Sequence, residues 1–125
     1  MLTLAVSLRK TGPDSDTVPA RLAREVFDAH PFAKLIVITD DDVDIHVPED
    51  VFWALSTRCN LGSDSVTFSD YPPLPMDPSQ TAGWLAERGC PGRSYVDATV
   101  PYRVRHLTER AFAGPPPRRR RAARR

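Results

Sequence analysis

The feature that most constrains this chain is a short apolar run that ends in acids. Residues 34–39 read KLIVIT, and DDD follows at residues 40–42. An unbroken aliphatic and β-branched run is typical of a strand that is covered on both faces, as in a parallel sheet. The rest of the chain should therefore supply helices that flank the sheet, on both faces or mostly on one.

The segment before this run predicts one strand and one helix. Residues 2–8 are largely apolar and are followed by basic residues and the turn-rich sequence TGPDSD, which indicates a strand and its end. A helix should begin near Thr17, with Pro19 in its first turn, and end at His30. Its apolar positions at helical spacing are Val18, Leu22, Val26 and Phe27.

The segment after the run predicts a second helix and a third strand. Pro48 suits a first helical turn, and Glu49 and Asp50 beside it favour the positive end of the helix dipole. The buried face of this helix should consist of Val51, Leu55 and either Phe52 or Trp53, and we expect both aromatic residues near the core. Residues 65–68 should form the third strand.

This alternation predicts an α/β fold: a small, mostly parallel sheet with flanking helices and right-handed crossovers. The length fits one domain, which we place over residues 1–113. Residues 70–80 carry four prolines and should form an extended loop outside the core, and residues 83–88 a short helical turn. A C-terminal amphipathic helix is expected over residues 102–113, with Val104, Leu107, Ala111 and Phe112 on its apolar side.

The charges are distributed unevenly. Six of the 17 basic residues lie in RRRRAARR at the C-terminal end, which leaves 11 basic against 16 acidic residues before it. Residues 114–125, rich in Pro and Arg, cannot bury enough apolar surface to fold and are predicted to be a disordered tail. No aromatic residue alternates with the arginines to stack bases, so we expect a solubilising or partner-docking tail rather than a nucleic-acid binder.

The cysteines and the N-terminal residues indicate the compartment. Cys59 and Cys90 are too few and too far apart for a zinc site, and we expect two reduced thiols, with a disulfide as the alternative. Nothing resembles a signal peptide, and no apolar run approaches the roughly 20 residues that span a bilayer. The expectation is a cytoplasmic protein without a membrane segment.

The acid run has three interpretations. Asp40, Asp41 and Asp42, with Asp44 just beyond, follow the carboxyl end of a strand, where open parallel sheets bind ligands. Their oxygens would suit Mg²⁺ or Mn²⁺, or could contact another chain. We favour a structural role, because aspartates also accept hydrogen bonds from loop amides and helix N–H groups. Arg58 should pair with helix carbonyls or a nearby acid, and a substrate carboxylate is its alternative partner.

A longer stretch resembles a known family. Residues 34–60, KLIVITDDDVDIHVPEDVFWALSTRCN, are similar to the signature of the C-terminal domain of the UbiD-type decarboxylases, the 3-polyprenyl-4-hydroxybenzoate carboxy-lyases. The likeness includes LAVSLRK upstream, PLPMDPS in the proline-rich loop and YVDATVP near residue 100. It covers about residues 2–105.

The resemblance implies a partnership rather than a catalytic site. Full-length members have a preceding domain that holds prenylated FMN with a divalent metal and potassium, and that supplies an Arg and two Glu for acid–base chemistry. No segment here resembles that domain, so we expect no catalytic residue, no metal and no cofactor on this chain alone. A large UbiD-type catalytic subunit would carry them. By the same likeness, the proline-rich loop would border the substrate cleft, through Tyr71, Pro73, Leu74 and Met76.

The expected function is therefore the small subunit of a split decarboxylase that acts on an aromatic or α,β-unsaturated carboxylic acid. Decarboxylation leaves a carbanion-like centre that needs an electron sink, which a cofactor provides and amino-acid side chains do not easily replace. One alternative is a non-catalytic assembly or regulatory module that forms a homo-oligomer. Another is an autonomous enzyme or metal protein built on the acid run.

Overall fold

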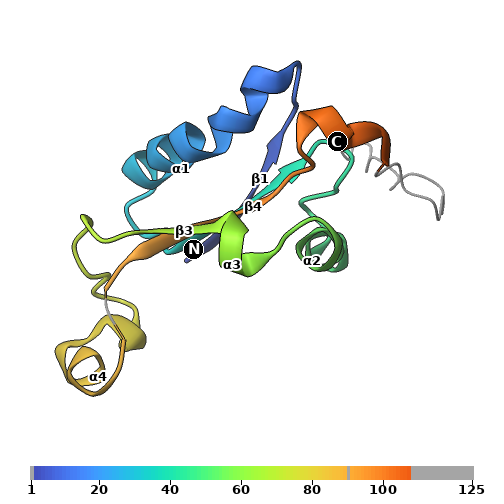
Figure 1. The fold of residues 1–125 in the computed structure, drawn as a ribbon. Helices are drawn as coiled ribbons and strands as arrows, with labels where there is room; N and C mark the ends of the chain where they lie inside the picture. Colours follow the sequence, from blue (N-terminus) through green and yellow to red (C-terminus); the bar gives the residue numbers. More distant parts are fainter. Residues whose placement is uncertain (1, 90, 108–125) are drawn as a thin grey trace, which may run out of the picture.

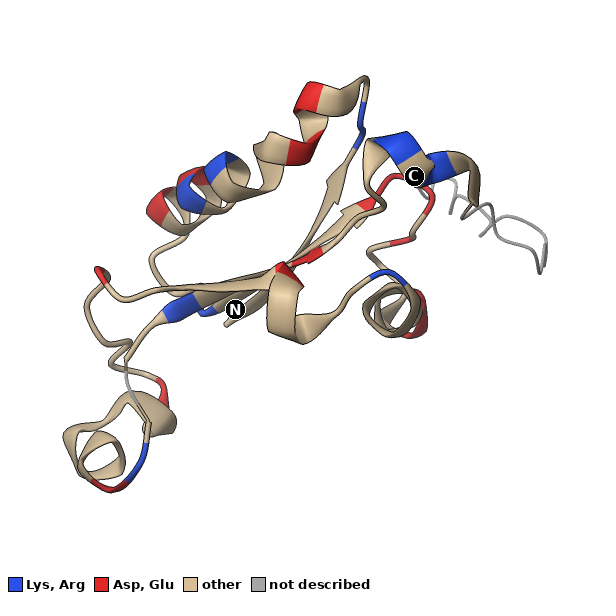
Figure 2. Cartoon of the chain, in the orientation of Figure 1, with Lys and Arg blue, Asp and Glu red and all other residues tan. Residues whose placement is uncertain are grey.

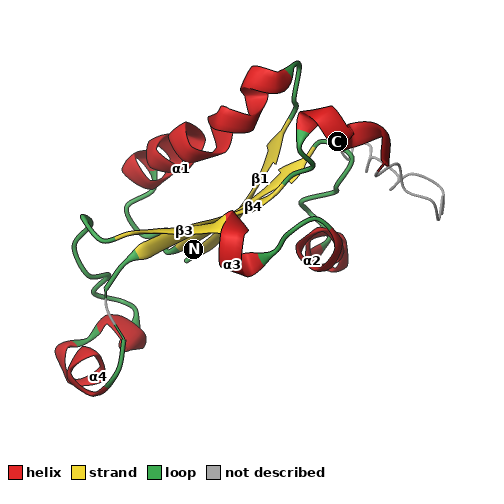
Figure 3. Ribbon diagram, viewed as in Figure 1, coloured by secondary structure: helices red, strands yellow, loops and turns green. Residues whose placement is uncertain are grey.

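A four-stranded sheet forms the centre of the molecule. The computed structural model describes residues 2–89 and 91–107. The strands are β1 (Thr3–Leu8), β2 (Leu35–Asp40), β3 (Ser65–Phe68) and β4 (Arg93–Ala98), in the spatial order β1-β2-β4-β3. β1 and β4 both pair with β2 in parallel, and β3 pairs with β4 in antiparallel fashion (Figure 3).

The sequence-based prediction of a small, mostly parallel sheet with flanking helices is confirmed, with two corrections. β4 was not predicted, although it lies between β2 and β3. β3 was expected to join a parallel array, but it runs antiparallel at the edge of the sheet. Both features depend on pairing between distant segments, which local periodicity does not record.

Helices cover both faces of the sheet. α1 (Val18–Ala29) lies on one side, whereas α2 (Pro48–Thr57) and α3 (Leu61–Asp64) lie on the other (Figure 1). α4 (Ala82–Glu87) extends beyond the sheet at the end where β4 begins. Three short 3₁₀ helices complete the chain: η1 (Pro13–Thr17), η2 (Pro78–Gln80) and η3 (Tyr102–Leu107).

Alternation along β2 divides the core into two parts. Ile36 and Ile38 pack with Phe27 of α1 on one face of the sheet. Val37, between them in sequence, packs with Ala54 of α2 on the other face. Successive residues of a strand point to opposite faces, so a strand with a helical layer on each side must be apolar throughout. This explains the continuous run that the sequence shows.

Two predictions about burial were wrong. Phe52 is 67% exposed, whereas Trp53 is partly buried against the α2-side core. Adjacent residues on a helix are about 100° apart, so only one of them can face the sheet. Leu74 is 2% exposed, although its loop was predicted to lie outside the core. Proline-rich backbone can therefore still place one apolar side chain in the interior.

The C-terminal predictions lie partly outside the described residues. The described part of the expected terminal helix is η3, with Leu107 exposed. Residues 108–113, the tail over 114–125 and Cys90 are not described. Cys59 is a free thiol. No helix among the described residues is long and apolar enough to cross a membrane.

Candidate functional site

Arg58 organises the acid run at the carboxyl edge of the sheet. Its Nη1 and Nη2 atoms donate to the two carboxylate oxygens of Asp42 at 2.6 and 2.7 Å, and Nη1 also lies 3.0 Å from Asp40 Oδ2. The guanidinium packs over the Trp53 ring, 4.9 Å from its centroid. Only 5% of the Arg58 side chain is exposed. A two-pronged contact of this kind is a strong and directional form of ion pair.

Asp40 also joins two loops. Its Oδ2 atom accepts the Val100 N–H at 2.9 Å, so the segment after β4 is tied to the end of β2. Burial raises the pKa of the Asp40 carboxyl, against the opposing effects of the Val100 N–H and the Arg58 charge. Asp42 adds to the rise through like-charge repulsion. The Arg58 charge therefore opposes the rise in the pKa of Asp40.

The other acids of the run have separate contacts. Asp41 lies 3.9 Å from Arg9, and both side chains are exposed. Asp44 accepts the His46 N–H at 2.9 Å, and its own N–H donates to Asp50 at the start of α2, at 2.7 Å. Figure 2 shows these acids in red along the loop that leads from β2 to α2. Their described contacts are those of a loop that holds its own backbone in place.

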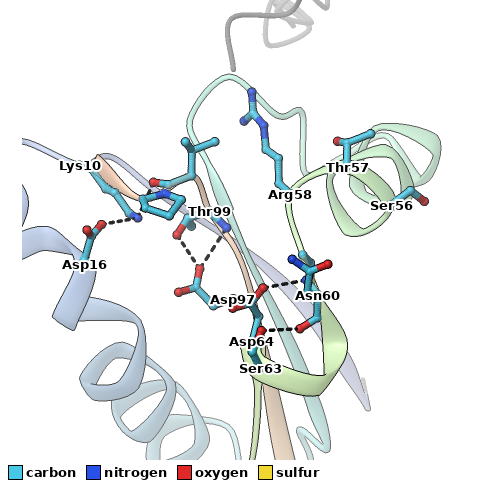
Figure 4. Close-up of a pocket in the computed structure, with 13 residues that line it drawn as sticks. Lys10, Asp16, Ser56, Thr57, Arg58, Asn60, Ser63, Asp64, Asp97 and Thr99 are labelled. Carbon is cyan, nitrogen blue, oxygen red and sulfur yellow. Dashed lines mark hydrogen bonds and ion pairs between the residues drawn. The ribbon is translucent and has the colours of Figure 1, made fainter. Parts of the chain in front are cut away.

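A cavity of about 550 Å³ opens at the same edge (Figure 4). Lys10, which follows β1, is buried there and donates to Asp16 and to the Val100 carbonyl, both at 2.7 Å. Asp97, at the end of β4, accepts hydrogen bonds from the N–H and hydroxyl of Thr99. Across the cavity, α2, α3 and the segment that joins them contribute Ser56, Thr57, Arg58, Cys59, Asn60, Ser63 and Asp64.

Asp16 fixes the C-terminal segment against the cavity. Its carboxylate accepts the Tyr102 N–H at 3.2 Å as well as the Lys10 ammonium. Desolvation acts to raise the pKa of Asp16, but the hydrogen bonds from Lys10 and Tyr102 outweigh it, so the pKa is lowered. The contact joins η1 to η3, which are far apart in sequence. Sequence periodicity gave no signal for this contact.

The cavity does not fit a phosphorylated flavin or its metal ions. Lys10 and Arg58 are both engaged by acids of this chain, so neither is presented for a phosphate. No group of three His, Cys, Asp or Glu side chains among the described residues is arranged to hold a metal ion. Burial raises the pKa of the Cys59 thiol, which favours the protonated and unreactive form. The lining instead offers hydroxyl and amide groups for hydrogen bonding.

The predicted substrate-cleft residues lie at the opposite, amino edge of the sheet. The Tyr71 ring packs 5.7 Å from that of Phe27, and its hydroxyl donates to Asp28 at 2.9 Å. Pro73 and Met76 are exposed, whereas Leu74 is buried. The acid run and the proline-rich loop are the two candidate sites predicted from the sequence. The structure places them at opposite ends of the strands (Figure 1).

Polar contacts hold the proline-rich loop against the sheet. Asp77 lies 2.6 Å from Lys34 Nζ and accepts hydrogen bonds from Ser79, and these contacts lower the pKa of its carboxyl. Gln80 accepts the Leu74 N–H at 2.7 Å and donates to the Gly92 carbonyl at 3.0 Å. The Asp-Pro-Ser sequence at residues 77–79 is a signal for this turn that the sequence reasoning did not use.

The chain is similar to decarboxylases of one family in its sequence. Residues 1–98 match the family described as the 3-octaprenyl-4-hydroxybenzoate carboxy-lyase C-terminal domain. Gallate decarboxylase of Lactiplantibacillus plantarum is 27% identical over 114 residues, which cover 88% of this chain and 23% of that protein.

Three solved structures have a similar fold. The apo 3,4-dihydroxybenzoic acid decarboxylase of Klebsiella pneumoniae has a TM-score of 0.77 at 27% identity, with 86% of this chain and 22% of that chain covered. The UbiD-class enzyme HmfF of Pelotomaculum thermopropionicum in complex with FMN has a TM-score of 0.66 at 28% identity, with coverages of 85% and 22%. The vanillic acid decarboxylase of Sedimentibacter hydroxybenzoicus, a two-subunit complex designated ShVdcCD, has a TM-score of 0.64 at 25% identity, with coverages of 80% and 20%. The chain spans about a fifth of the length of these proteins.

Proposed function

Because this chain belongs to the UbiD-type carboxy-lyase family through its C-terminal domain, we propose that it is the small subunit of a split decarboxylase that depends on prenylated FMN. A separate large subunit would carry the cofactor and the catalytic residues. The substrate would be an aromatic or α,β-unsaturated carboxylic acid, and the complex would work in the cytoplasm. The observation that carries this proposal is the match of residues 1–98 to the family's C-terminal domain.

The chemistry of the described side chains supports this division of labour. A decarboxylation needs an electron sink, which the flavin supplies in this family. The two buried cations at the cavity, Lys10 and Arg58, are committed to acids of their own chain. The binding of FMN in HmfF and the two-subunit composition of the vanillic acid decarboxylase support a flavin-bearing partner.

In this proposal the proline-rich loop forms one wall of the substrate cleft. Pro73 and Met76 offer exposed apolar surface to a ligand held by the large subunit. Tyr71 and Leu74 pack on this chain and hold the loop in position. We therefore assign substrate contact to Pro73 and Met76, and a positioning role to Tyr71 and Leu74.

The test is co-expression with a UbiD-type catalytic polypeptide from the same organism. We expect the two chains to elute together in size-exclusion chromatography, and turnover of an aromatic acid to rise when this chain is present. Separate elution, with activity indifferent to this chain, would contradict the proposal. So would flavin absorbance and decarboxylation by this chain alone.

A loop variant with a matched control tests the cleft assignment. Met76→Ala should change kcat/KM of the complex without lowering its melting temperature, because the side chain is exposed. Leu61→Ala removes an equally exposed side chain from α3, at the carboxyl edge, and should leave kcat/KM unchanged. Equal effects of the two substitutions would remove the special role of the loop.

A homo-oligomeric assembly or regulatory module is the second candidate function. The observation that favours it is the exposed apolar surface on the α2 side, where Phe52 and Leu61 lie. Exposed apolar side chains are common where proteins associate. Light scattering of the isolated chain decides this alternative, since a strict monomer contradicts it.

A further inference from the structure

Arg93 is a buried cation whose charge is not matched by an acid. It is the first residue of β4, pairs across the sheet with Phe68, and is 5% exposed. Its Nε atom is enclosed and has no hydrogen-bond partner in the part of the chain that the structure describes. Its side chain makes no ion pair or hydrogen bond with a described residue, and its guanidinium carbon lies 4.6 Å from the centroid of the Tyr71 ring.

A second arginine, which packs on the same cluster of aromatic rings, differs from Arg93 because an acid of this chain pairs with it. Arg24 of α1 also stacks on aromatic rings, 3.7 Å from the Phe68 centroid and 5.4 Å from that of Tyr71. However, its Nη1 atom lies 2.7 Å from Asp70 Oδ2, so this charge has a partner. Asp28, the other acid at the cluster, accepts the Tyr71 hydroxyl. Asp70 and Asp28 are thus engaged by groups other than Arg93.

An unmatched charge in the interior is unfavourable for the isolated chain. Taking a guanidinium out of water removes its hydration, and a cation–π contact with one ring restores only part of it. Proteins normally pair such a group with a carboxylate and additional hydrogen bonds. Arg93 stacks on an aromatic ring but has no acid beside it among the described residues. An arginine can bind a carboxylate through two parallel N–H groups.

The amino edge of the sheet, where Arg93 lies, has the composition of an interface. Phe32, Met76 and Trp84 are all exposed and all belong to segments at the amino edge of the sheet. Lys34 of the Phe32 segment contacts Asp77 beside Met76, so these two segments adjoin. Aromatic residues, methionine and arginine are enriched at the centres of protein interfaces. Arg93 begins β4 at this edge, and its neighbour Ser94 donates its N–H to the Lys34 carbonyl at 3.0 Å.

We propose that Arg93, stacked on Tyr71, anchors a carboxylate side chain of the catalytic polypeptide that docks on the amino edge. The inference rests on the proposed function for the identity of that polypeptide. The unmatched positive charge favours an acidic residue at the contact. The exposed apolar side chains of the same edge favour a protein surface as the binding partner. The docked chain would also lie beside the exposed Pro73 and Met76.

The test compares two arginine-to-methionine variants that change the net charge equally. Arg93→Met replaces the buried cation with an apolar chain of similar length, and Arg9→Met removes a cation that is 83% exposed at the opposite edge. The affinity of each variant for the catalytic polypeptide is measured by calorimetry. Removing one partner of a buried charge pair at an interface weakens binding by about 30-fold or more. We expect that loss for Arg93→Met and less than about a twofold change for Arg9→Met, as is usual for exposed charges.

The stability of the unbound chain separates a docking role from a structural one. If Arg93 serves an incoming acid, Arg93→Met should keep or raise the melting temperature of the isolated chain while it weakens the complex. A clear fall in melting temperature would overturn the inference, because it would mean that Arg93 stabilises its own fold. Arg93→Lys, which keeps the charge but loses the planar fork, should weaken binding by an intermediate factor.

Failure of the inference can be distinguished from failure of the proposed function. If the wild-type chain and the Arg93→Met variant bind the catalytic polypeptide equally well, the role of Arg93 is wrong. The proposal of a split decarboxylase is then unaffected. If the wild-type chain does not bind any UbiD-type catalytic polypeptide, the proposed function fails and the inference falls with it. Self-association of the isolated chain that Arg93→Met abolishes would place the acid on a second copy and would overturn the stated partner.

Discussion

Replacing Arg58 with methionine should destabilise the fold strongly. The substitution keeps an apolar stem that can pack near Trp53 but removes the cation between Asp40 and Asp42. The Asp40 side chain is 16% exposed, so its charge would be left largely buried, whereas the Asp42 side chain is 47% exposed and can be hydrated. Breaking a fully buried pair costs about 3–5 kcal/mol, and exposed pairs are worth about 0–1 kcal/mol.

We therefore expect a loss of about 2–4 kcal/mol, carried mainly by Asp40. For a domain of roughly 100 residues this corresponds to a fall in melting temperature of about 8–16 °C. Urea unfolding followed by circular dichroism measures the loss. Adding Asp40→Asn should restore part of it, because asparagine carries no charge and its oxygen can still accept the Val100 N–H.

The pH dependence of this variant gives a sharper test. Burial already raises the pKa of Asp40 in the folded chain, and loss of the Arg58 charge should raise it further. A carboxyl whose folded pKa lies above its unfolded value binds more protons when folded, so the folded state gains stability as the pH falls toward that pKa. The deficit of Arg58→Met should thus shrink as the pH falls from 7 toward the raised pKa of Asp40. A deficit below 1 kcal/mol, or one independent of pH, would refute the reasoning.

Three further substitutions test other parts of the structure. Thr39→Val should raise the free energy of unfolding by about 1 kcal/mol in urea titrations, because the buried hydroxyl has no hydrogen-bond partner among the described residues. Asp77→Asn should lower it by about 1–2 kcal/mol at pH 7. Because the pKa of Asp77 is lowered from 3.8 in the folded chain, this difference should disappear as the pH falls below 3.8 in acid-unfolding curves. Gly92→Ala should lower the melting temperature, since a Cβ atom there would lie 2.7 Å from Thr67 Cγ2 and 3.3 Å from the Phe68 carbonyl oxygen.

The sequence predicted those elements whose signal is local. β2 was found because burial on both faces requires an unbroken apolar run, and α1 because its apolar residues recur at helical spacing. β4 was missed because RSYVDA mixes charged and apolar residues and follows a loop-rich stretch. Its central place in the sheet comes from pairing with β2 and β3, which are distant in sequence.

The candidate sites were predicted in outline only. The acid run could be located from the sequence, but the two-pronged contact of Arg58 with Asp42 joins residues 16 positions apart and depends on how α2 returns to the sheet. The proline-rich loop was assigned from a family resemblance, and its internal burial of Leu74 depends on Gln80, which no periodicity marks. Arg93 was not noticed, because a single arginine at a strand end has no meaning until its burial is known.

The two edges of the sheet differ in whether this chain balances its own charges. At the carboxyl edge, Arg58 lies between Asp40 and Asp42, and Lys10 is paired with Asp16. Consecutive acids are tolerated at the carboxyl edge because one guanidinium offsets their mutual repulsion. The charges of this edge therefore stabilise the chain's own fold. At the amino edge, Arg93 is buried without an acid from the described residues. Natural proteins retain such unfavourable groups where function requires them. The sheet edge with the unmatched charge, rather than the one with the conspicuous acids, is therefore where association with another chain should be sought.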